Sequence, residues 1–479
     1  MPKHKRLILP GIALNSAGAK GVAVGRTEEG KAVMVKGAVP GDVADVRVVR
    51  KKKSHLMGEV DRLIEPSPSR TDPACAHFEL CGGCVWQNMI YEDQLRWKDD
   101  EVVQNLRRIG GVEPLERSGI LPAPMKFGYR NKMEFSFSSE RWLSAEEIGS
   151  GREIEDRRAL GFHIPGRWDR IFEVEKCLLQ PDPSNAIRNQ VGQWAREHDW
   201  SFYHPREQTG WLRNLMIRNN REGDFMVMVQ TAYRDSAARK ILADGLLASF
   251  PQISSLWFAV NEKTNDAWYD LDMELISGQE AIIEKMKGWN GGPDMQFRIG
   301  PKSFYQTNPE QASELYRIAL DMSGIEEGSV VYDLYSGTGT IALYMAQRAA
   351  KVIGVEGVEE AVQDAKKNAA LNGIENARFF AGDMRKVLNE DFFAREGVPD
   401  VVMTDPPREG MHPDVVAQLL SAAPKRIIYI SCNSATQARD IALLKEAYQV
   451  SKSQAVDMFP QTAHVENVLC LDRLDGSKP

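Results

Sequence analysis

Residues 330–343 read Val-Val-Tyr-Asp-Leu-Tyr-Ser-Gly-Thr-Gly-Thr-Ile-Ala-Leu. The apolar, β-branched beginning predicts a buried strand that ends near Asp333. Gly337 and Gly339 predict a tight turn, because glycine lets the backbone bend sharply and approach a ligand closely. A helix is expected from Thr340. In a sheet of alternating strands and helices, this turn would lie at the edge where such sheets bind ligands.

The next predicted strand begins at Val352 and ends in the carboxylate of Glu356. A carboxylate at this place can accept hydrogen bonds from both ribose hydroxyls of a nucleoside. The third glycine of the dinucleotide-binding pattern is missing, since Ala342 stands three residues after Gly339. A pyrophosphate is therefore disfavoured, and adenosine without a diphosphate suggests S-adenosylmethionine. An enzyme that uses NAD is the weaker alternative.

The chain after Arg298 alternates between strand and helix patterns. Helices are expected at 310–324, 341–350 and 358–371, and strands near 330 and 352 and at 377–381, 399–405 and 426–431. Regular alternation implies a parallel sheet with right-handed crossovers. Residues 301–479 are therefore predicted to form an α/β, Rossmann-like domain.

Polar residues stand at the ends of four of these strands: Asp333 with Tyr335, Glu356, Asp383, and the run Asp405-Pro406-Pro407-Arg408. All four ends fall on the ligand side of the sheet, where Asp383 suits an adenine amino group. Four such ends beside a glycine turn are typical of a class I methyltransferase. The form Asp-Pro-Pro-aromatic lines pockets that methylate adenine amino groups. Arg408 replaces the aromatic residue here, which disfavours that alternative.

A cysteine follows the last of these strands. Cys432 is flanked by Ser431 and Asn433, polar groups that core packing does not need, although an inert buried cysteine is the usual interpretation. Methylation of an amine needs no thiol, whereas C5 of a pyrimidine becomes nucleophilic once a thiolate adds to C6. A base must then remove the C5 proton. His464 and Glu466 are available at the start of the final strand, where the ordinary interpretation of Glu466 is a solvated turn acid.

The charge of the chain is distributed unevenly. The net charge of the 479 residues is −7, which alone argues against a nucleic-acid partner. Residues 1–64 nevertheless carry +7 and the remainder −14. The same segment has short β-rich runs broken by glycines, so residues 1–66 are predicted to form a small barrel with a basic cluster at 50–53. A basic barrel on an acidic body indicates nucleic-acid contact, and a solvated basic face is the plainer alternative.

The sequence contains no run of about 18 apolar residues, so no membrane contact is expected. The apolar run Leu7-Ile8-Leu9 is too short for the core of a signal peptide. The expected location is the cytoplasm, where clustered cysteines point to metal binding or catalysis before disulfides.

Three cysteines are closely spaced in the pattern C-x5-C-x2-C: Cys75, Cys81 and Cys84. A disulfide would leave one thiol over, whereas a zinc ion or an iron–sulfur cluster uses all three and needs a fourth ligand. Cys177 is the candidate outside the C-terminal half, and His77 is the rival for zinc. Zinc loops usually supply cysteines in close pairs, so a [4Fe-4S] cluster is favoured over zinc.

The middle of the chain is predicted to be mixed. Residues 89–110 suit an amphipathic helix, and 124–300 suit an α+β unit with strands near 128–137, 225–231 and 253–260. The first of these strands alternates cations and aromatics that could hold phosphates and bases. A half-buried strand with a solvated charged face is the better interpretation of that pattern.

Several motifs taken together resemble the RNA uracil-5-methyltransferase family, in its 23S rRNA type with a TRAM domain and an iron–sulfur cluster. They are Phe-Tyr-Gln-Thr-Asn at 304–308, Asp-Leu-Tyr-Ser-Gly-Thr-Gly at 333–339, Asp-Pro-Pro-Arg at 405–408, Ser-Cys-Asn at 431–433 and His-Val-Glu-Asn-Val at 464–468. The resemblance implies that Cys432 is the nucleophile and Glu466 the base. It implies cofactor contacts from Gln306, Tyr335, Thr340, Glu356, Asp383 and Asp405, and a [4Fe-4S] cluster on Cys75, Cys81, Cys84 and Cys177.

Two residues depart from the family pattern. Ser434 stands where proline is usual, so the loop after Cys432 is expected to be less rigid. Thr340 stands where asparagine is common. The resemblance also implies that the helix at 89–110 packs on the catalytic domain, although it belongs in sequence to a central iron–sulfur and RNA-binding domain at 67–300.

The chain is therefore expected to be a monomeric enzyme that uses S-adenosylmethionine to methylate uridine C5 in RNA. The preferred substrate is 23S rRNA, because family members with both barrel and cluster tend to act on it, and tRNA is the alternative. An RNA cytosine C5-methyltransferase and a non-catalytic RNA-binding factor are weaker alternatives.

Overall fold

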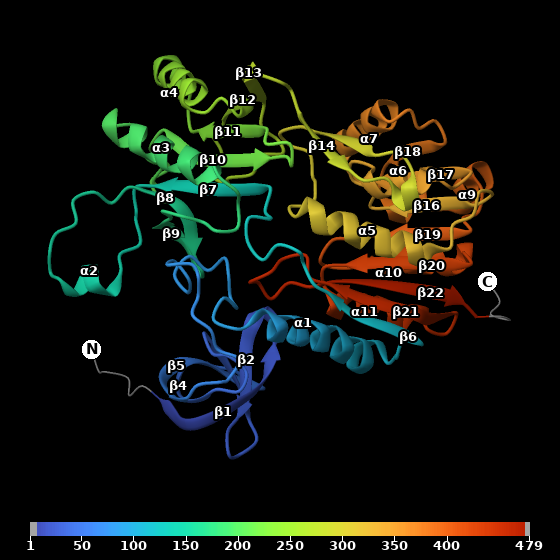
Figure 1. Ribbon diagram of the computed structural model, residues 1–479, viewed down its shortest axis with the longest axis horizontal. Helices are drawn as coiled ribbons and strands as arrows, with labels where there is room; N and C mark the ends of the chain where they lie inside the picture. The colour runs from blue at the N-terminus through green and yellow to red at the C-terminus, as the bar shows by residue number, and fades with distance from the viewer. Residues whose placement is uncertain (1–6, 475–479) are drawn as a thin grey trace.

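The first part of the chain forms a closed barrel in the computed structural model, which describes residues 7–474 (Figure 1). Its strands are β1 (Ile8–Gly18), β2 (Val22–Arg26), β3 (Ala32–Lys36), β4 (Val43–Lys51) and β5 (His55–Glu65), in the order β1-β2-β3-β5-β4. Alternate side chains such as Leu14, Val33 and Val46 are fully buried inside it, as period-2 strands require. The predicted barrel is confirmed.

A second sheet occupies the middle of the chain and has the order β13-β12-β11-β10-β7-β8-β9. Its strands are β7 (Lys132–Ser138), β8 (Ala159–Ile164), β9 (Arg167–Glu173), β10 (Leu212–Asn219), β11 (Phe225–Thr231), β12 (Ile253–Val260) and β13 (Met273–Gly278). Helices α3 (Ser184–Glu197) and α4 (Ser236–Ser249) pack their apolar residues on one face of this sheet. The short helix α2 (Ala145–Gly149) lies outside it, on the loop between β7 and β8 (Figure 1).

The third sheet is the predicted α/β sheet, with the order β18-β17-β16-β19-β20-β22-β21-β6. Its core strands are β16 (Val330–Leu334), β17 (Lys351–Glu356), β18 (Ala377–Ala381), β19 (Val401–Thr404) and β20 (Arg426–Ser431), which run parallel. Strand β22 (Glu466–Arg473) pairs antiparallel with β20 and with β21 (Tyr448–Val456).

The helices of this domain are α5 (Pro309–Ser323), α6 (Thr340–Ala346), α7 (Glu359–Leu371), α8 (Met384–Val387), α9 (Glu390–Glu396), α10 (Pro413–Ala422) and α11 (Ser434–Leu444). The alternation predicted from residue 298 onward is present. Helix α6 ends earlier than the predicted 341–350, because its last turn tightens: the N–H groups of Gln347 and Arg348 donate to the carbonyls of Tyr344 and Met345, three residues back.

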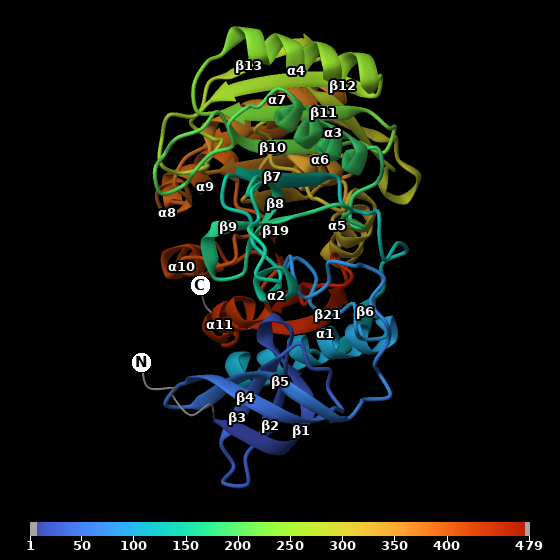
Figure 2. The same cartoon turned by 90° about the vertical axis from the view of Figure 1, so that its left-hand side faces the viewer.

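Two segments from the predicted central domain belong structurally to this third sheet. Helix α1 (Tyr91–Asn105), continued by a wide turn at 106–110, packs against α11, and β6 (Glu116–Leu121) pairs in parallel with β21. Figures 1 and 2 show α1 between the barrel and the C-terminal sheet. Both segments therefore lie on the C-terminal sheet, although they stand within the range 67–300 in the chain.

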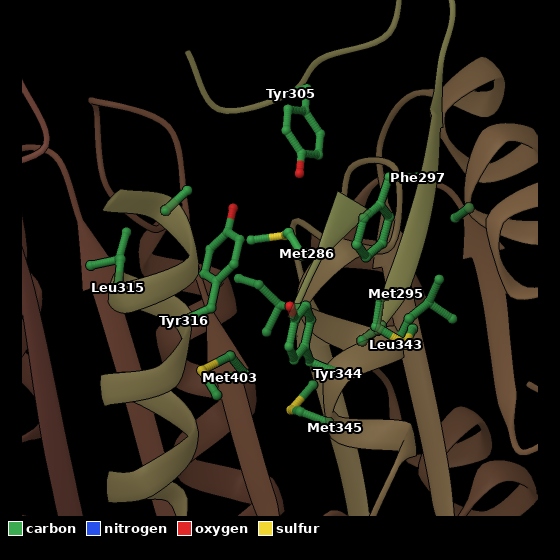
Figure 3. Packing of buried hydrophobic residues seen from close by; sticks show 14 of the residues in the cluster. Met286, Met295, Phe297, Tyr305, Leu315, Tyr316, Leu343, Tyr344, Met345 and Met403 are labelled. Carbon is green, nitrogen blue, oxygen red and sulfur yellow. The ribbon is translucent and has the colours of Figure 1, made fainter. Parts of the chain in front are cut away.

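A small hairpin links the middle and C-terminal parts. Its strands β14 (Ile282–Met286) and β15 (Met295–Ile299) pair with each other. Figure 3 shows Met286, Met295 and Phe297 of this hairpin packed with Tyr344 and Met345 of α6. The hairpin therefore covers one face of the third sheet.

Among residues 7–474, no helix is long and apolar enough to cross a membrane.

Candidate active site

A cavity of about 870 Å³ lies where the cysteine loop, the central sheet and the carboxyl ends of the C-terminal strands meet. It is lined from the C-terminal domain by Gln306, Tyr335, Asp405, Arg408, Cys432, His464 and Glu466, and from the other side by Cys75, Cys81, Cys84, Arg130, Lys132 and Cys177. One cavity therefore contains the predicted catalytic residues, half of the predicted cofactor residues and all four clustered thiols.

Cys432 and Glu466 face each other across two paired strands. Ser431, the last residue of β20, pairs with Asn467 of β22 in antiparallel register. Cys432 follows Ser431 and Glu466 precedes Asn467, so the two occupy the next facing position. Facing Cβ atoms in antiparallel strands lie about 4.5–5.5 Å apart. A nucleophile and a base can therefore reach the same ring, although they are far apart in sequence.

Burial controls the ionisation of these groups. Burial and the carboxyls of Glu466 and Asp405 raise the pKa of the Cys432 thiol to about 11, whereas Arg408 lowers it. Burial and Asp405 raise the pKa of Glu466 well above its usual value, and burial raises the pKa of Asp405 to about 7. Glu466 is only 5% exposed, so it is not the solvated turn acid of the ordinary interpretation.

The loop that carries Cys432 is tied to the Asp-Pro-Pro-Arg loop. Asn433 donates from Nδ2 to the Arg408 carbonyl at 2.9 Å, and the Thr436 hydroxyl donates to the same oxygen at 3.1 Å. Asn433 Oδ1 also accepts from the Ala435 N–H and caps α11. The Ser434 hydroxyl accepts a hydrogen bond from Asn105 Nδ2 at 2.8 Å. These contacts fix the loop at the position where the family usually has a proline.

The glycine turn after β16 leaves room for a ligand beside its backbone. Gly337 and Gly339 have φ of 52° and 82°, in the left-handed region that favours glycine. A Cβ on Gly339 would lie 3.0 Å from both Ala365 and Phe379, whereas a Cβ on Gly337 would meet no described atom within 4 Å. The backbone at Gly337 therefore faces open space that a ligand can occupy.

The six predicted cofactor residues divide into two groups. Gln306, Tyr335 and Asp405 line the cavity. Thr340, Glu356 and Asp383 lie at the neighbouring strand ends and helix start but are not part of its lining.

Asp383 already has a partner. It pairs with Arg385, with its Oδ2 2.6 Å from Arg385 Nη2. The hydrogen bonds and charge of Arg385 hold the pKa of Asp383 at about 2. An adenine amino group would have to share this carboxylate with Arg385.

The four thiols gather at the other end of the cavity. Burial, and then the nearby thiols of Cys81, Cys177 and Cys75, raise the pKa of Cys84 to about 12 against a hydrogen bond from Gln87. Cys177 thus joins the loop despite its distance in sequence, and its N–H donates to Asn185 Oδ1 at 2.8 Å. Four soft sulfur donors meet here, a set typical of zinc or iron–sulfur sites.

The thiols are not arranged around a single ion. No group of three or more His, Cys, Asp or Glu side chains in the described part of the chain could hold a metal ion. His77, the rival zinc ligand, packs edge-on against Phe172 with ring centroids 5.2 Å apart. A four-iron cluster spreads its thiolates more widely than one ion does, because each thiolate binds a different iron. A metal at this place stays a prediction.

The strand that enters the central sheet carries its charged residues to the cavity. Arg130, Lys132 and Glu134 alternate along the segment entering β7, and all three line the cavity, while Glu134 is also exposed to solvent. Burial lowers the pKa of Lys132, as does the neighbouring Arg218. The alternation predicts that the charged residues share one face of the strand. A period of two does not tell whether that face meets solvent or a cavity.

Known proteins resemble this chain over most of its length. The profile of the tRNA (Uracil-5-)-methyltransferase family matches residues 273–474, and that of the TRAM domain matches residues 14–60. An uncharacterized RNA methyltransferase of Bacteroides thetaiotaomicron is 47% identical over 457 residues, which cover 95% of this chain and 99% of that protein. The chain belongs to the RNA (uracil-5-)-methyltransferase family. A second such protein, from Porphyromonas gingivalis, is 45% identical over 96% of this chain and 99% of its own.

A solved structure supports the membership over the full length. The Pyrococcus abyssi tRNA (uracil-54, C5)-methyltransferase in complex with S-adenosyl-L-homocysteine superposes with a TM-score of 0.73 at 27% identity, covering 97% of this chain and 100% of that one. The predicted family, the predicted RNA (uracil-5-)-methyltransferase activity and the Rossmann-like class I methyltransferase fold are confirmed.

Proposed function

We propose that this methyltransferase modifies uridine C5 through a covalent adduct between Cys432 and C6 of the base. The observation that carries the proposal is the facing of Cys432 and Glu466 in one cavity. The thiolate of Cys432 adds to C6, and the electron pair of the C5–C6 double bond moves to the C4 oxygen as an enolate. Arg408 favours the thiolate, whereas burial and the carboxyls of Glu466 and Asp405 disfavour it and leave the pKa of the thiol raised to about 11.

Glu466 acts after methyl transfer. Its carboxylate removes the C5 proton, the C5–C6 double bond re-forms, and the C6–S bond breaks to release Cys432. Burial and Asp405 raise the pKa of Glu466, and a carboxylate with a raised pKa is a stronger base. The same burial shields the adduct from water.

The methyl donor is S-adenosylmethionine, which supplies an electrophilic methyl group when bound. Asp333 Oδ1 is buried and has no hydrogen-bond partner among residues 7–474, while its Oδ2 accepts from the Ala342 N–H at 2.9 Å. An unpaired buried oxygen in β16, four residues before the open space at Gly337, fits a polar ligand. Gln306, Tyr335, Thr340, Glu356, Asp383 and Asp405 are proposed to hold it.

The four thiols of Cys75, Cys81, Cys84 and Cys177 are proposed to hold a [4Fe-4S] cluster. Their convergence and their purely sulfur character support this assignment. The cluster would fasten the loop of residues 75–87 to the central sheet. Its role is structural, so no step of methylation is assigned to it.

The barrel is proposed to bind RNA. The domains are proposed to divide at 1–66, 67–300 and 301–479, with α1 and β6 packed on the last of these.

The substrate proposed first is 23S rRNA. A tRNA is the second candidate, favoured by the full-length likeness to an enzyme named for uracil 54 of tRNA. Methylation of both transcripts in parallel, followed by mass analysis, decides between them. A monomer remains the expected state in solution.

The mechanism is tested by the step at which the reaction stops in each variant. Cys432→Ala should form no adduct and transfer no methyl group. Glu466→Gln should still form the adduct but remove the C5 proton about 10²–10⁴-fold more slowly, so enzyme remains bound to methylated RNA on a denaturing gel. RNA carrying 5-fluorouridine should trap the wild type in the same way, because fluorine cannot leave as a cation. Turnover by Cys432→Ala, or no trapping by 5-fluorouridine, contradicts the mechanism.

A further inference from the structure

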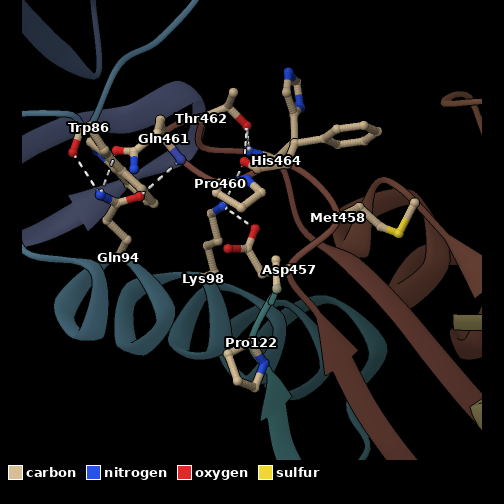
Figure 4. Close-up of polar contacts among 12 residues, drawn as sticks. Trp86, Gln94, Lys98, Pro122, Asp457, Met458, Pro460, Gln461, Thr462 and His464 are labelled. Atoms are coloured by element: carbon tan, nitrogen blue, oxygen red, sulfur yellow. Dashed lines mark hydrogen bonds and ion pairs between the residues drawn. The ribbon is translucent and has the colours of Figure 1, made fainter. Parts of the chain in front are cut away.

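The segment of residues 457–464 lies between β21 and β22 and is separated from Glu466 only by Val465. It contains no regular secondary structure, yet Phe459, Thr462 and His464 line the cavity. Figure 4 shows this segment lying against α1, with Gln94 and Lys98 directed toward it and the ring of His464 directed away from the helix. The backbone at Glu466 therefore depends on the pairing of β22 with β20 and β21 and, where the chain enters the strand, on what fixes residues 457–464.

An ion pair fixes its first half. Lys98 Nζ lies 2.6 Å from Asp457 Oδ1, and neither side chain is exposed to solvent. Lys98 also donates to the Phe459 carbonyl at 3.1 Å, and the Tyr91 hydroxyl donates to Asp457 Oδ2 at 2.7 Å. Tyr91 and Lys98 of α1 thus hold the side chain and the backbone of the segment at the same time, and Figure 4 shows the contacts of Lys98.

A glutamine fixes its second half. Gln461 is buried and has a φ of 69°, which is uncommon for a residue other than glycine and persists only where neighbours hold it. Its N–H donates to Gln94 Oε1 at 3.1 Å, and Gln94 Nε2 donates to Gln461 Oε1 at 3.1 Å. The same Nε2 reaches the Trp86 carbonyl at 2.9 Å.

The cysteine loop joins the same residue. The Gln461 carbonyl accepts from the N–H groups of Val85 and Trp86 at 2.9 and 3.2 Å, directly after Cys84. The cysteine loop, α1 and the turn before Glu466 therefore meet at one strained backbone position.

We propose that Lys98 and Gln94 are positioning residues that hold residues 457–464, and through them Glu466, in the geometry needed to remove the C5 proton. The inference rests on the proposed function of Glu466. Anchoring α1 alone would not require a buried charge, since apolar pairs of similar volume often stabilise as well or better. Lys98 instead contacts both the Asp457 carboxylate and the Phe459 carbonyl, and these two contacts together fix one backbone conformation of the segment.

The test separates proton removal from methyl transfer. RNA labelled with tritium at uridine C5 and a methyl-labelled donor report the two steps in a single turnover. In the wild type, tritium release should follow methyl transfer closely. In Lys98→Met, methyl transfer should remain near the wild-type rate while tritium release slows about 10-fold to 100-fold, the scale expected for a small misplacement. The covalent adduct should accumulate.

A variant that merely destabilises the protein would not separate the two rates. Lys351→Met is the matched control: Lys351 binds Glu396 at 2.9 Å at the far end of β17, and its loss should leave tritium release in step with methyl transfer. If Lys98→Met does not fold, the pair of changes Lys98→Met and Asp457→Leu removes both charges and leaves none unpaired. This double variant should regain the wild-type melting temperature and still release tritium late.

Two outcomes overturn the inference. Lys98→Met or the double variant could release tritium in step with methyl transfer, while Glu466→Gln shows the delay; the positioning role is then wrong and the role of Glu466 stands. If Glu466→Gln itself shows no delay, the proposed function of Glu466 fails first.

Discussion

Glu356 Oε2 accepts a hydrogen bond from the Gly337 N–H at 2.9 Å, and its Oε1 accepts one from the Val358 N–H at 3.0 Å. The carboxylate that ends β17 is thus oriented by the glycine turn that follows β16. Each oxygen keeps a second lone pair, so the carboxylate can hold the turn and accept from ribose hydroxyls together.

Replacing Glu356 should therefore weaken cofactor binding. Glu356→Gln removes the charge and turns one acceptor into a donor, and hydrogen bonds to charged groups are worth enough to raise the Kd for S-adenosylmethionine about 10-fold to 100-fold. Isothermal titration measures it. Glu359→Gln, an exposed change in the first turn of α7, should leave the Kd unchanged. Equal affinities for both variants would remove Glu356 from the cofactor site.

The pH dependence of Cys432 follows from its surroundings. With its pKa raised to about 11, the thiol is mostly protonated at neutral pH, so its alkylation by iodoacetamide should accelerate about tenfold per pH unit between pH 7 and 9. Asp405→Asn removes a carboxyl that raises this pKa, so the profile should move to lower pH. Arg408→Gln should move it to higher pH. Peptide mass spectrometry follows Cys432 separately from the other thiols. A rate that is flat over this range would show a thiolate already formed at pH 7.

The thiol cluster should colour the protein. Protein purified without oxygen should be brown and contain about four irons per chain, as a cubane cluster requires. Cys177→Ser should lose the colour, because Cys177 is the proposed ligand outside the loop. Cys470→Ser is the comparison, since Cys470 is buried in β22 among apolar residues and should not alter the iron content. Stoichiometric zinc and a colourless protein would exclude the cluster.

The basic end of β4 should govern the salt dependence of RNA binding. Arg50, Lys51, Lys52 and Lys53 are all exposed. Changing them to glutamine should weaken RNA binding and reduce the slope of log affinity against log salt by about 0.7 to 0.9 for each phosphate that is no longer neutralised. Changing Lys366 and Lys367, exposed on α7 and far from the barrel in Figure 1, should leave the slope unaltered. Filter binding at several salt concentrations measures both. An unchanged slope in the first variant would mean that this cluster does not touch RNA.

Local patterns predicted the C-terminal domain well. Each parallel strand there is a short, largely apolar run with a polar residue at its end or within two residues of it, and the turn at Gly337 and Gly339 is specified by backbone conformation. The family motifs around Cys432 and Glu466 indicated the reaction. Their facing position depends on the register of β20 and β22, which no local period encodes.

Long-range pairing explains what the sequence did not reveal. Strand β6 joins β21 across more than half of the chain, and Lys98 finds Asp457 at a similar separation. An amphipathic pattern shows that α1 needs an apolar partner but not which one. Likewise, the cations of Arg130 and Lys132 could be predicted, but the cavity that they face depends on three segments meeting.

The position of β6 at the outer edge of the C-terminal sheet has a consequence for how the protein is made. Residues 91–121 leave the ribosome long before β21, so α1 and β6 must wait for their partners with apolar residues such as Val102 and Leu106 uncovered. A fragment that begins at residue 301 would instead present the bare edge of β21, a template for pairing with other chains. The catalytic unit therefore cannot be excised by a single cut in the gene.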